Sequence, residues 1–252
     1  MRSRYRPKVL LLGSEPFGGL SLNPAAEVVG QFAGNVSEAY DVVGAVVPVS
    51  YTDLPTRIAS LVATIEPAIA IGLGLFVGAS CVRVETTAIN IADFDVVDNH
   101  GVFVRNQPLE VGGPGARLAT YNAPRIASAL RADGIPARVS HHAGTHLCNL
   151  TLFNLLKACA GESRPVICGF IHLPLMPHQA AEIIENETRQ DHSLVRVPTE
   201  LASMDLAMQR RAVEIVLAEA VAGLPADSDT RSRILSEPHS SRGYGQKIKE
   251  SQ

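Results

Sequence analysis

The sequence has little of what marks several large classes of protein. Aromatic residues make up only 5% of its 252 residues, and its formal net charge of -3 comes without a basic stretch. Nucleic-acid surfaces combine basic patches with aromatic side chains for stacking, so we expect no nucleic-acid partner. The apolar run at residues 9–12 is too short for a signal-peptide core or a membrane span. We therefore predict a cytoplasmic protein that makes no membrane contact.

Cysteine is also scarce, with four residues whose positions show no paired spacing. Because the sequence shows no export signal, this pattern favours reduced thiols over a disulfide framework. Three of the four, Cys81, Cys159 and Cys168, lie in apolar surroundings, where cysteine usually serves as a small buried hydrophobic residue. The fourth, Cys148, has a different setting and is considered below.

Hydrophobic residues are plentiful, at 46% of the chain against 19% charged residues, so a large core can be buried. Short β-rich runs alternate with longer amphipathic stretches, which is typical of α/β proteins. We predict a single α/β domain over residues 1–225, with a central, twisted, mostly parallel sheet and helices on both faces. Residues 226–252 are polar and lack periodicity, and we expect them to form a C-terminal extension.

Periodicity and turn residues give the boundaries of the expected elements. Asn23 is the expected N-cap of the first helix, with Pro24 at its first position. Residues 98–101 are expected to form a turn, and residues 109–115 a loop. Strands are predicted over residues 8–12, 42–49, 68–73, 81–91, 137–140 and 165–173. Helices are predicted over residues 24–32, 52–65, 120–133, 148–160, from about 178, and 199–222.

Cys148 lies where a glycine-containing turn meets an apolar helix, in the run AGTHLCNL at residues 143–150. The start of a helix has unpaired backbone N–H groups and the positive end of the helix dipole, and both stabilise a thiolate. The same N–H groups could bind an oxyanion after the sulfur attacks a carbonyl. Cys148 is therefore a candidate nucleophile, although most free cysteines are simply buried.

A nucleophilic thiolate needs a base and a group that orients the base. His172 ends the apolar strand at residues 166–172, and open α/β sheets present their ligands at the carboxyl ends of strands. The alternative is a histidine that merely bonds a backbone carbonyl. Glu85 lies in a largely apolar strand, so it is either exposed or has a partner such as His172.

Two other functional readings remain open at this point. A metal-dependent hydrolase would use a cluster of histidines together with the cysteine, since zinc accepts both ligand types. Gly144 lies within this cluster, however, and a metal bound to Cys148 would suppress its nucleophilicity. A non-catalytic binding protein on the same fold is the other reading. The cluster consists of His141, His142, His146, Cys148 and His172.

Over residues 8–221 the chain resembles the pyroglutamyl peptidase type I family, also called pyrrolidone-carboxylate peptidases. The segments that carry the resemblance are GSEPFGG at 13–19 with Asn23-Pro24, ETTAIN at 85–90, DNHG at 98–101, AGTHLCN at 143–149 and GFIHLP at 169–174. The resemblance implies a single α/β domain and a cysteine peptidase that removes an N-terminal 5-oxoproline from a peptide or small amide. It implies Cys148 as nucleophile, His172 as general base and acid, and Glu85 as the orienting carboxylate. It further implies no metal or organic cofactor and a homo-oligomer, either a dimer or a tetramer.

The sequence departs from the family where the substrate is expected to bind. The family usually has aromatic residues where Ser14 and His146 stand, Gln at the place of Leu75, and Arg at the places of Ala79, Thr86 and Asp95. Such changes alter which polar groups a substrate may carry, so the acyl group is either 5-oxoproline or a related small ring, or the chain hydrolyses a different amide. The residues expected to contact substrate are Phe17, Ser14, Asn23, Leu75, Asp95, Val96, His146 and Leu147.

Overall fold

The computed structural model describes residues 6–32, 39–189 and 200–225. Its centre is a six-stranded sheet with the strand order β2-β1-β3-β8-β4-β7. All neighbouring strands are parallel except β4 and β8, which are antiparallel. The predicted mostly parallel sheet is thus confirmed. The strands are β1 (Lys8–Ser14), β2 (Asp41–Val47), β3 (Ile69–Leu75), β4 (Val82–Glu85), β7 (Ala137–Ser140) and β8 (Ile167–Leu173).

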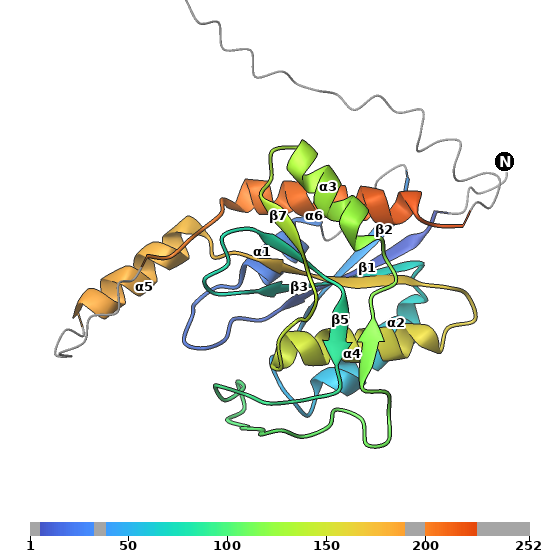
Figure 1. Ribbon diagram of the computed structural model, residues 1–252, viewed down its shortest axis with the longest axis horizontal. Coiled ribbons are helices and arrows are strands. Elements are labelled where there is room, and N and C mark those ends of the chain that lie inside the picture. The colour runs from blue at the N-terminus through green and yellow to red at the C-terminus, as the bar shows by residue number, and fades with distance from the viewer. Residues whose placement is uncertain (1–5, 33–38, 190–199, 226–252) are drawn as a thin grey trace, which may run out of the picture.

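Helices cover both faces of the sheet, as predicted (Figure 1). Three helices pack on one face: α1 (Pro24–Phe32), α3 (Ala123–Ala132) and α6 (Leu206–Ala222). Two helices, α2 (Leu54–Ile65) and α4 (Leu147–Ala160), pack on the other face. Helix α5 (Pro177–Arg189) projects from the body of the molecule. None of the helices in the described residues is long and apolar enough to cross a membrane.

The central strands carry apolar side chains on both faces because both faces are covered. In β1, Val9 and Leu11 belong to the core under α1, α3 and α6, whereas Leu10 and Leu12 belong to the core under α2 and α4. All four are at most 1% exposed. Strands buried on both faces read as continuous hydrophobic runs, which explains why this strand was predictable from sequence.

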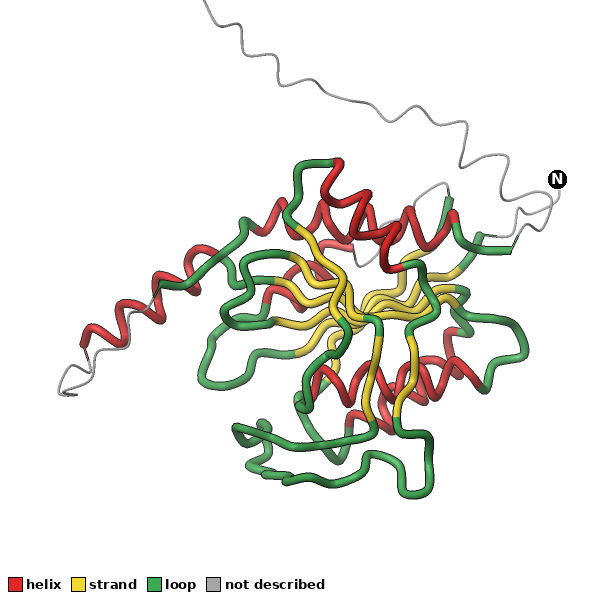
Figure 2. The backbone as a smooth tube through the Cα atoms, viewed as in Figure 1, coloured by secondary structure: helices red, strands yellow, loops and turns green. Residues whose placement is uncertain are grey.

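The predicted strand over residues 81–91 is wrong in one respect, because the chain changes sheets within it. Strand β4 ends at Glu85, and β5 (Thr87–Ile89) pairs instead with β6 (Ala116–Leu118) in a separate antiparallel ribbon. Thr86 is the joint, since its N–H donates to the Ser140 carbonyl while its own carbonyl accepts from the Ala119 N–H. The loops between β5 and β6 lie beside α4, at the lower edge of Figure 2.

The starts of two helices differ from the prediction by three residues or more. The last helix begins at Leu206 rather than near 199, because Asp205 caps it by accepting from the Ala207 N–H. Met204 instead donates its N–H to the Leu175 carbonyl. Helix α3 begins after Asn122 rather than at 120. Residue 199 and the predicted extension over 226–252 lie outside the described residues.

Candidate active site

The three candidate catalytic residues come from three elements that meet on the α2/α4 face of the sheet. Cys148 is the second residue of α4, whose entry turn passes through Gly144 at a φ of 82°. His172 lies near the end of β8, in register with Gly74 of β3 on one side. Glu85 ends β4 on the other side of β8, opposite Phe170. Alternation along the strands then directs the side chains of Phe170 and His172 to the same face.

Glu85 and His172 form a buried pair. The His172 Nδ1 lies 2.7 Å from the Glu85 Oε1, and the two side chains are 2% and 0% exposed. A carboxylate can only accept, so Nδ1 donates and Nε2 is left to face Cys148, which also hydrogen-bonds to His172. The rings of Phe170 and Phe76 stand edge-on to the imidazole, at centroid distances of 5.0 and 5.3 Å. The structure thus resolves the choice for Glu85: it is buried and has a partner.

The contacts in this site favour the ionised forms of both His172 and Glu85. Burial by itself lowers the pKa of His172, but the charge and hydrogen bond of Cys148, followed by those of Glu85, outweigh it and raise the pKa to about 9. Burial raises the pKa of Glu85, yet the hydrogen bond and charge of His172, with Ser140 and Arg83, bring it below its usual value. At neutral pH the geometry therefore holds an imidazolium between a carboxylate and the cysteine sulfur.

Two glycines of β3 make room for this arrangement. A Cβ on Gly74 would lie 2.9 Å from the Cys148 Sγ and 2.7 Å from the Phe170 ring. A Cβ on Gly72 would lie 2.5 Å from the same ring, without meeting the sulfur. Glycine inside a strand often marks such a close approach, so the run IGLGL at residues 71–75 held a signal that the sequence analysis did not use.

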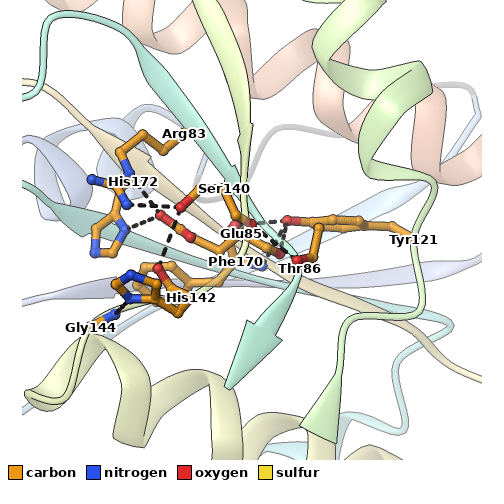
Figure 3. A network of polar contacts seen from close by, with 9 residues as sticks. All are labelled: Arg83, Glu85, Thr86, Tyr121, Ser140, His142, Gly144, Phe170 and His172. Carbon is orange, nitrogen blue, oxygen red and sulfur yellow. Dashed lines mark hydrogen bonds and ion pairs between the residues drawn. The ribbon is translucent and has the colours of Figure 1, made fainter. Parts of the chain in front are cut away.

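Tyr121 ties together the two strands that carry Glu85 and His172 (Figure 3). Its hydroxyl lies 2.7 Å from the Glu85 carbonyl oxygen and 2.8 Å from that of Phe170, and it accepts weakly from the Phe170 N–H. Its ring occupies the space that a Cβ on Gly169 would fill. Sequence reasoning did not find this residue, because it lies 36 residues from Glu85 along the chain.

Two aromatic rings pack against His146, the N-cap residue of α4. The imidazole of His146 stacks on Phe17 at 6.4 Å and tilts against Phe94 at 4.2 Å, and its Nε2 lies 3.1 Å from the Val96 carbonyl oxygen. Burial lowers the pKa of His146, so the ring is neutral at neutral pH. Leu75 is 4% exposed and belongs to a small apolar cluster that Phe17 also contacts.

The other residues expected to contact substrate have varied settings. Leu147 is buried in the core beneath α4, while Ser14 is partly exposed and Asp95 is exposed. Asn23 is 1% exposed, and both ends of its amide are engaged: it accepts from the Ala25 N–H and donates to the Glu15 carbonyl. Asn23 therefore caps α1, as predicted, and fixes the loop that carries Phe17.

The structure gives the metal alternative no support. Within the described residues, no group of three or more His, Cys, Asp or Glu side chains is placed to hold a metal ion. The histidines of the cluster have other partners: His142 accepts from the Gly144 N–H, and His141 contacts the Thr86 hydroxyl. Of the remaining cysteines, Cys159 and Cys168 are buried as expected, whereas Cys81 is partly exposed.

Comparisons of the sequence and of the structure with known proteins all point to one family. The family model described as pyroglutamyl peptidase matches residues 7–218. The pyrrolidone-carboxylate peptidase of Vibrio vulnificus is 36% identical over 174 residues, covering 69% of this chain and 81% of that protein. The Pyrococcus furiosus enzyme of the same name is 32% identical over 213 residues, covering 84% and 99%. A solved structure of a mutant pyrrolidone carboxyl peptidase from Pyrococcus furiosus, 32% identical in sequence, superposes with a TM-score of 0.79 over 86% of this chain and all of that one.

Proposed function

This chain belongs to the pyroglutamyl peptidase family of cysteine peptidases, and we propose that it releases N-terminal 5-oxoproline from peptides through a thioester at Cys148. The observation that supports this most directly is the chain of contacts from Cys148 to His172 to Glu85. It supplies a nucleophile, a base and an orienting carboxylate in hydrogen-bond reach of one another.

In the proposed reaction, the Cys148 sulfur attacks the carbonyl carbon of the scissile amide. Backbone N–H groups in the first turn of α4, which have no partner within the helix, stabilise the oxyanion. The His172 imidazolium then protonates the departing amine, and the neutral ring activates the water that hydrolyses the thioester. Because the imidazolium is the acid, activity should fall as pH rises through about 9.

Three of the residues that we expect to contact substrate suit a small, uncharged ring. Phe17 and Leu75 are apolar, and His146 is held neutral with its Nε2 engaged by a backbone carbonyl. A lactam has no net charge, so it can enter such surroundings without the desolvation penalty that a free carboxylate or ammonium group would suffer. We therefore propose that the departures at Leu75 and His146 modify the acyl-binding wall and still accept 5-oxoproline.

A chromogenic 5-oxoprolyl amide, assayed beside the corresponding prolyl amide, tests this proposal. The wild type should cleave only the former, and Cys148→Ser should lose at least about a thousandfold in kcat/KM because the nucleophile is removed. Cys81→Ser is the matched control, as Cys81 is also partly exposed, and it should keep wild-type activity. No turnover by the wild type would contradict the substrate, and undiminished turnover by Cys148→Ser would contradict the nucleophile.

We also propose that the protein is a single domain over residues 1–225 that acts in the cytoplasm as a homo-oligomer. The four cysteines are free, which suits a reducing compartment. Several apolar side chains are exposed on the segment between β4 and α3, and exposed apolar patches often mark surfaces where subunits associate. Light scattering tests the oligomeric state, and a monomer would contradict the proposed homo-oligomer. The exposed apolar side chains are Val96, Val97, Phe103, Val111 and Leu118.

A further inference from the structure

Arg83 lies beside the catalytic pair (Figure 3). Three different contacts hold its side chain there. Its Nε lies 3.1 Å from the Glu85 Oε1, the same oxygen that accepts from His172. Its Nη2 donates to the Ser140 hydroxyl at 2.8 Å, and its guanidinium lies 4.2 Å above the centre of the Phe76 ring. The side chain is 19% exposed, so its charge is only partly screened by solvent.

The register of the sheet explains how Arg83 reaches this position. Arg83 pairs directly with His172 across the antiparallel β4 and β8 strands. It precedes Glu85 by two residues on β4, so both side chains emerge on the same face. The Phe76 ring, on which the Arg83 guanidinium stacks, is also edge-on to the His172 ring. Arg83 is therefore built into the same cluster as the catalytic pair.

The proposed reaction makes the Glu85 carboxylate depend on this cation. While His172 is an imidazolium, the fully buried carboxylate has two cationic neighbours. Once His172 has given its proton to the leaving amine, the guanidinium of Arg83 still balances the carboxylate. A buried carboxylate without a cationic partner is strongly disfavoured and would take up a proton. Arginine stays charged at any pH at which the enzyme works.

We propose that Arg83 is a positioning residue of this site: it keeps Glu85 ionised and aimed at His172 during the half of the cycle in which His172 is neutral. This inference rests on the proposed function. Phe76 and Ser140 fix the guanidinium, so that its charge stays in one place while the proton on His172 comes and goes.

Several titratable groups face the pair, and their charges set the expected direction of change. Cys148 approaches from α4, and Arg83 from β4 itself. Tyr121, from the segment before α3, contacts the Glu85 carbonyl and has its pKa raised by burial, so it is neutral. Removing the positive charge of Arg83 favours the protonated forms of Glu85 and of His172.

The test compares Arg83→Gln and Arg83→Lys with the wild type in two assays across pH. One assay is kcat/KM on the 5-oxoprolyl amide, and the other is the rate of Cys148 alkylation by iodoacetamide, followed by peptide mass spectrometry. We expect Arg83→Gln to lower kcat about tenfold or more with little change in KM. In plots of each rate against pH, the acidic and the basic limb should both move to higher pH, by about half a unit to one unit. Arg83→Lys should restore the wild-type limbs because it restores the charge.

Arg117→Gln is the matched control, because Arg117 also stacks on a phenylalanine, Phe153, and pairs with a glutamate, Glu110, away from the site. It should leave both profiles unchanged. Limbs that stay at the wild-type pH in Arg83→Gln, or that shift equally in Arg117→Gln, would overturn the proposal. If Arg83→Gln does not fold, Arg83→Met takes its place, since it also removes the charge and keeps a long side chain on β4: a shift in the same direction supports the proposal, and no shift overturns it. A wild type that cleaves no 5-oxoprolyl amide would count against the proposed function only, because alkylation needs no substrate.

Discussion

At the scale of single residues, the space around the Cys148 sulfur depends on a hydrogen atom at position 74. A methyl group there would come within 2.9 Å of the sulfur and 2.7 Å of the Phe170 ring, closer than real Cβ contacts. The ring is fully buried in the core under α4, so it has little freedom to move away. Cys148 as a residue is only partly buried, so we expect its side chain, rather than the ring, to move.

We therefore expect Gly74→Ala to displace the nucleophile. Its kcat/KM on the 5-oxoprolyl amide should fall on the order of a hundredfold, because small misplacements of a reacting atom have large effects on rate. Overpacking should also destabilise the fold by about 1–3 kcal/mol. Enzyme kinetics and urea unfolding measure the two effects separately.

Gly72→Ala provides the matched control for this prediction. Its Cβ would lie 2.5 Å from the Phe170 ring, slightly closer than the 2.7 Å of Gly74→Ala, and would not meet the Cys148 sulfur. It should therefore show a similar loss of stability with a much smaller loss of activity. Equal losses of activity in the two variants would mean that displacement of Phe170, rather than of the sulfur, explains the effect.

At the scale of elements, β4 is the strand that makes the site possible, because it runs antiparallel to β8 and brings Glu85 alongside it. Tyr121 fixes the spacing of these two strands through its hydroxyl, which contacts carbonyl oxygens of both. Thr120, next to it, bonds the opposite end of β8 by donating to Val166 and accepting from Cys168. The segment before α3 is thus a clamp along β8.

We expect Tyr121→Phe to weaken this clamp at the catalytic end. Leaving two buried carbonyl oxygens without the hydroxyl should lower the free energy of unfolding by about 1–3 kcal/mol. It should also lower kcat, because Glu85 and His172 lie on strands whose spacing is no longer fixed. Thr120→Val should cost comparable stability and retain more activity, since it acts at the far end of β8. Full activity of Tyr121→Phe would contradict the positioning role of the clamp.

The errors in element boundaries show which features of the fold hydrophobic periodicity cannot predict. Periodicity predicted β1 and α4 well, because each has a continuous apolar pattern that packing confirms. It could not show that the chain leaves the sheet at Thr86, because the hydrogen bonds that cause this come from Ser140 and Ala119. Partners so distant along the chain depend on the strand order, which periodicity does not contain.

At the scale of the whole molecule, the same limit separates the predictable part of the site from the rest. The sequence pattern named His172 as a candidate partner for Glu85, because a carboxylate in an apolar strand is either exposed or paired, and the family resemblance implied the pair. Arg83 and Tyr121 could not be placed, since their contacts depend on β4 lying next to β8. The order of the strands therefore assembles the site, while the sequence pattern alone identifies its most polar members.

Acid stability is a further property of the whole molecule, because it depends on buried carboxylates in different parts of the fold. Asp98 is 3% exposed, and its carboxylate accepts from the backbone N–H groups of Tyr51, His100 and Val102. Burial raises its pKa, but these three hydrogen bonds and the charge of His100 outweigh burial and lower it below the usual value. The pKa of Glu85 is lowered as well, chiefly by His172 acting against burial.

A carboxyl group whose pKa is lower in the folded state stabilises the fold above its ordinary pKa and loses that contribution as pH falls through its folded value. We therefore expect the free energy of unfolding to decline as pH falls below about 4.5. Asp98→Asn should be less stable than the wild type by about 1–3 kcal/mol at pH 7, and this difference should shrink as pH falls through the lowered pKa of Asp98, where the wild-type side chain also becomes neutral. Urea unfolding at several pH values measures this difference, and Asp53→Asn, at a side chain 57% exposed, should show little difference at any pH. If the difference in the free energy of unfolding between Asp98→Asn and the wild type stays constant with pH, the negative charge of Asp98 does not contribute to stability.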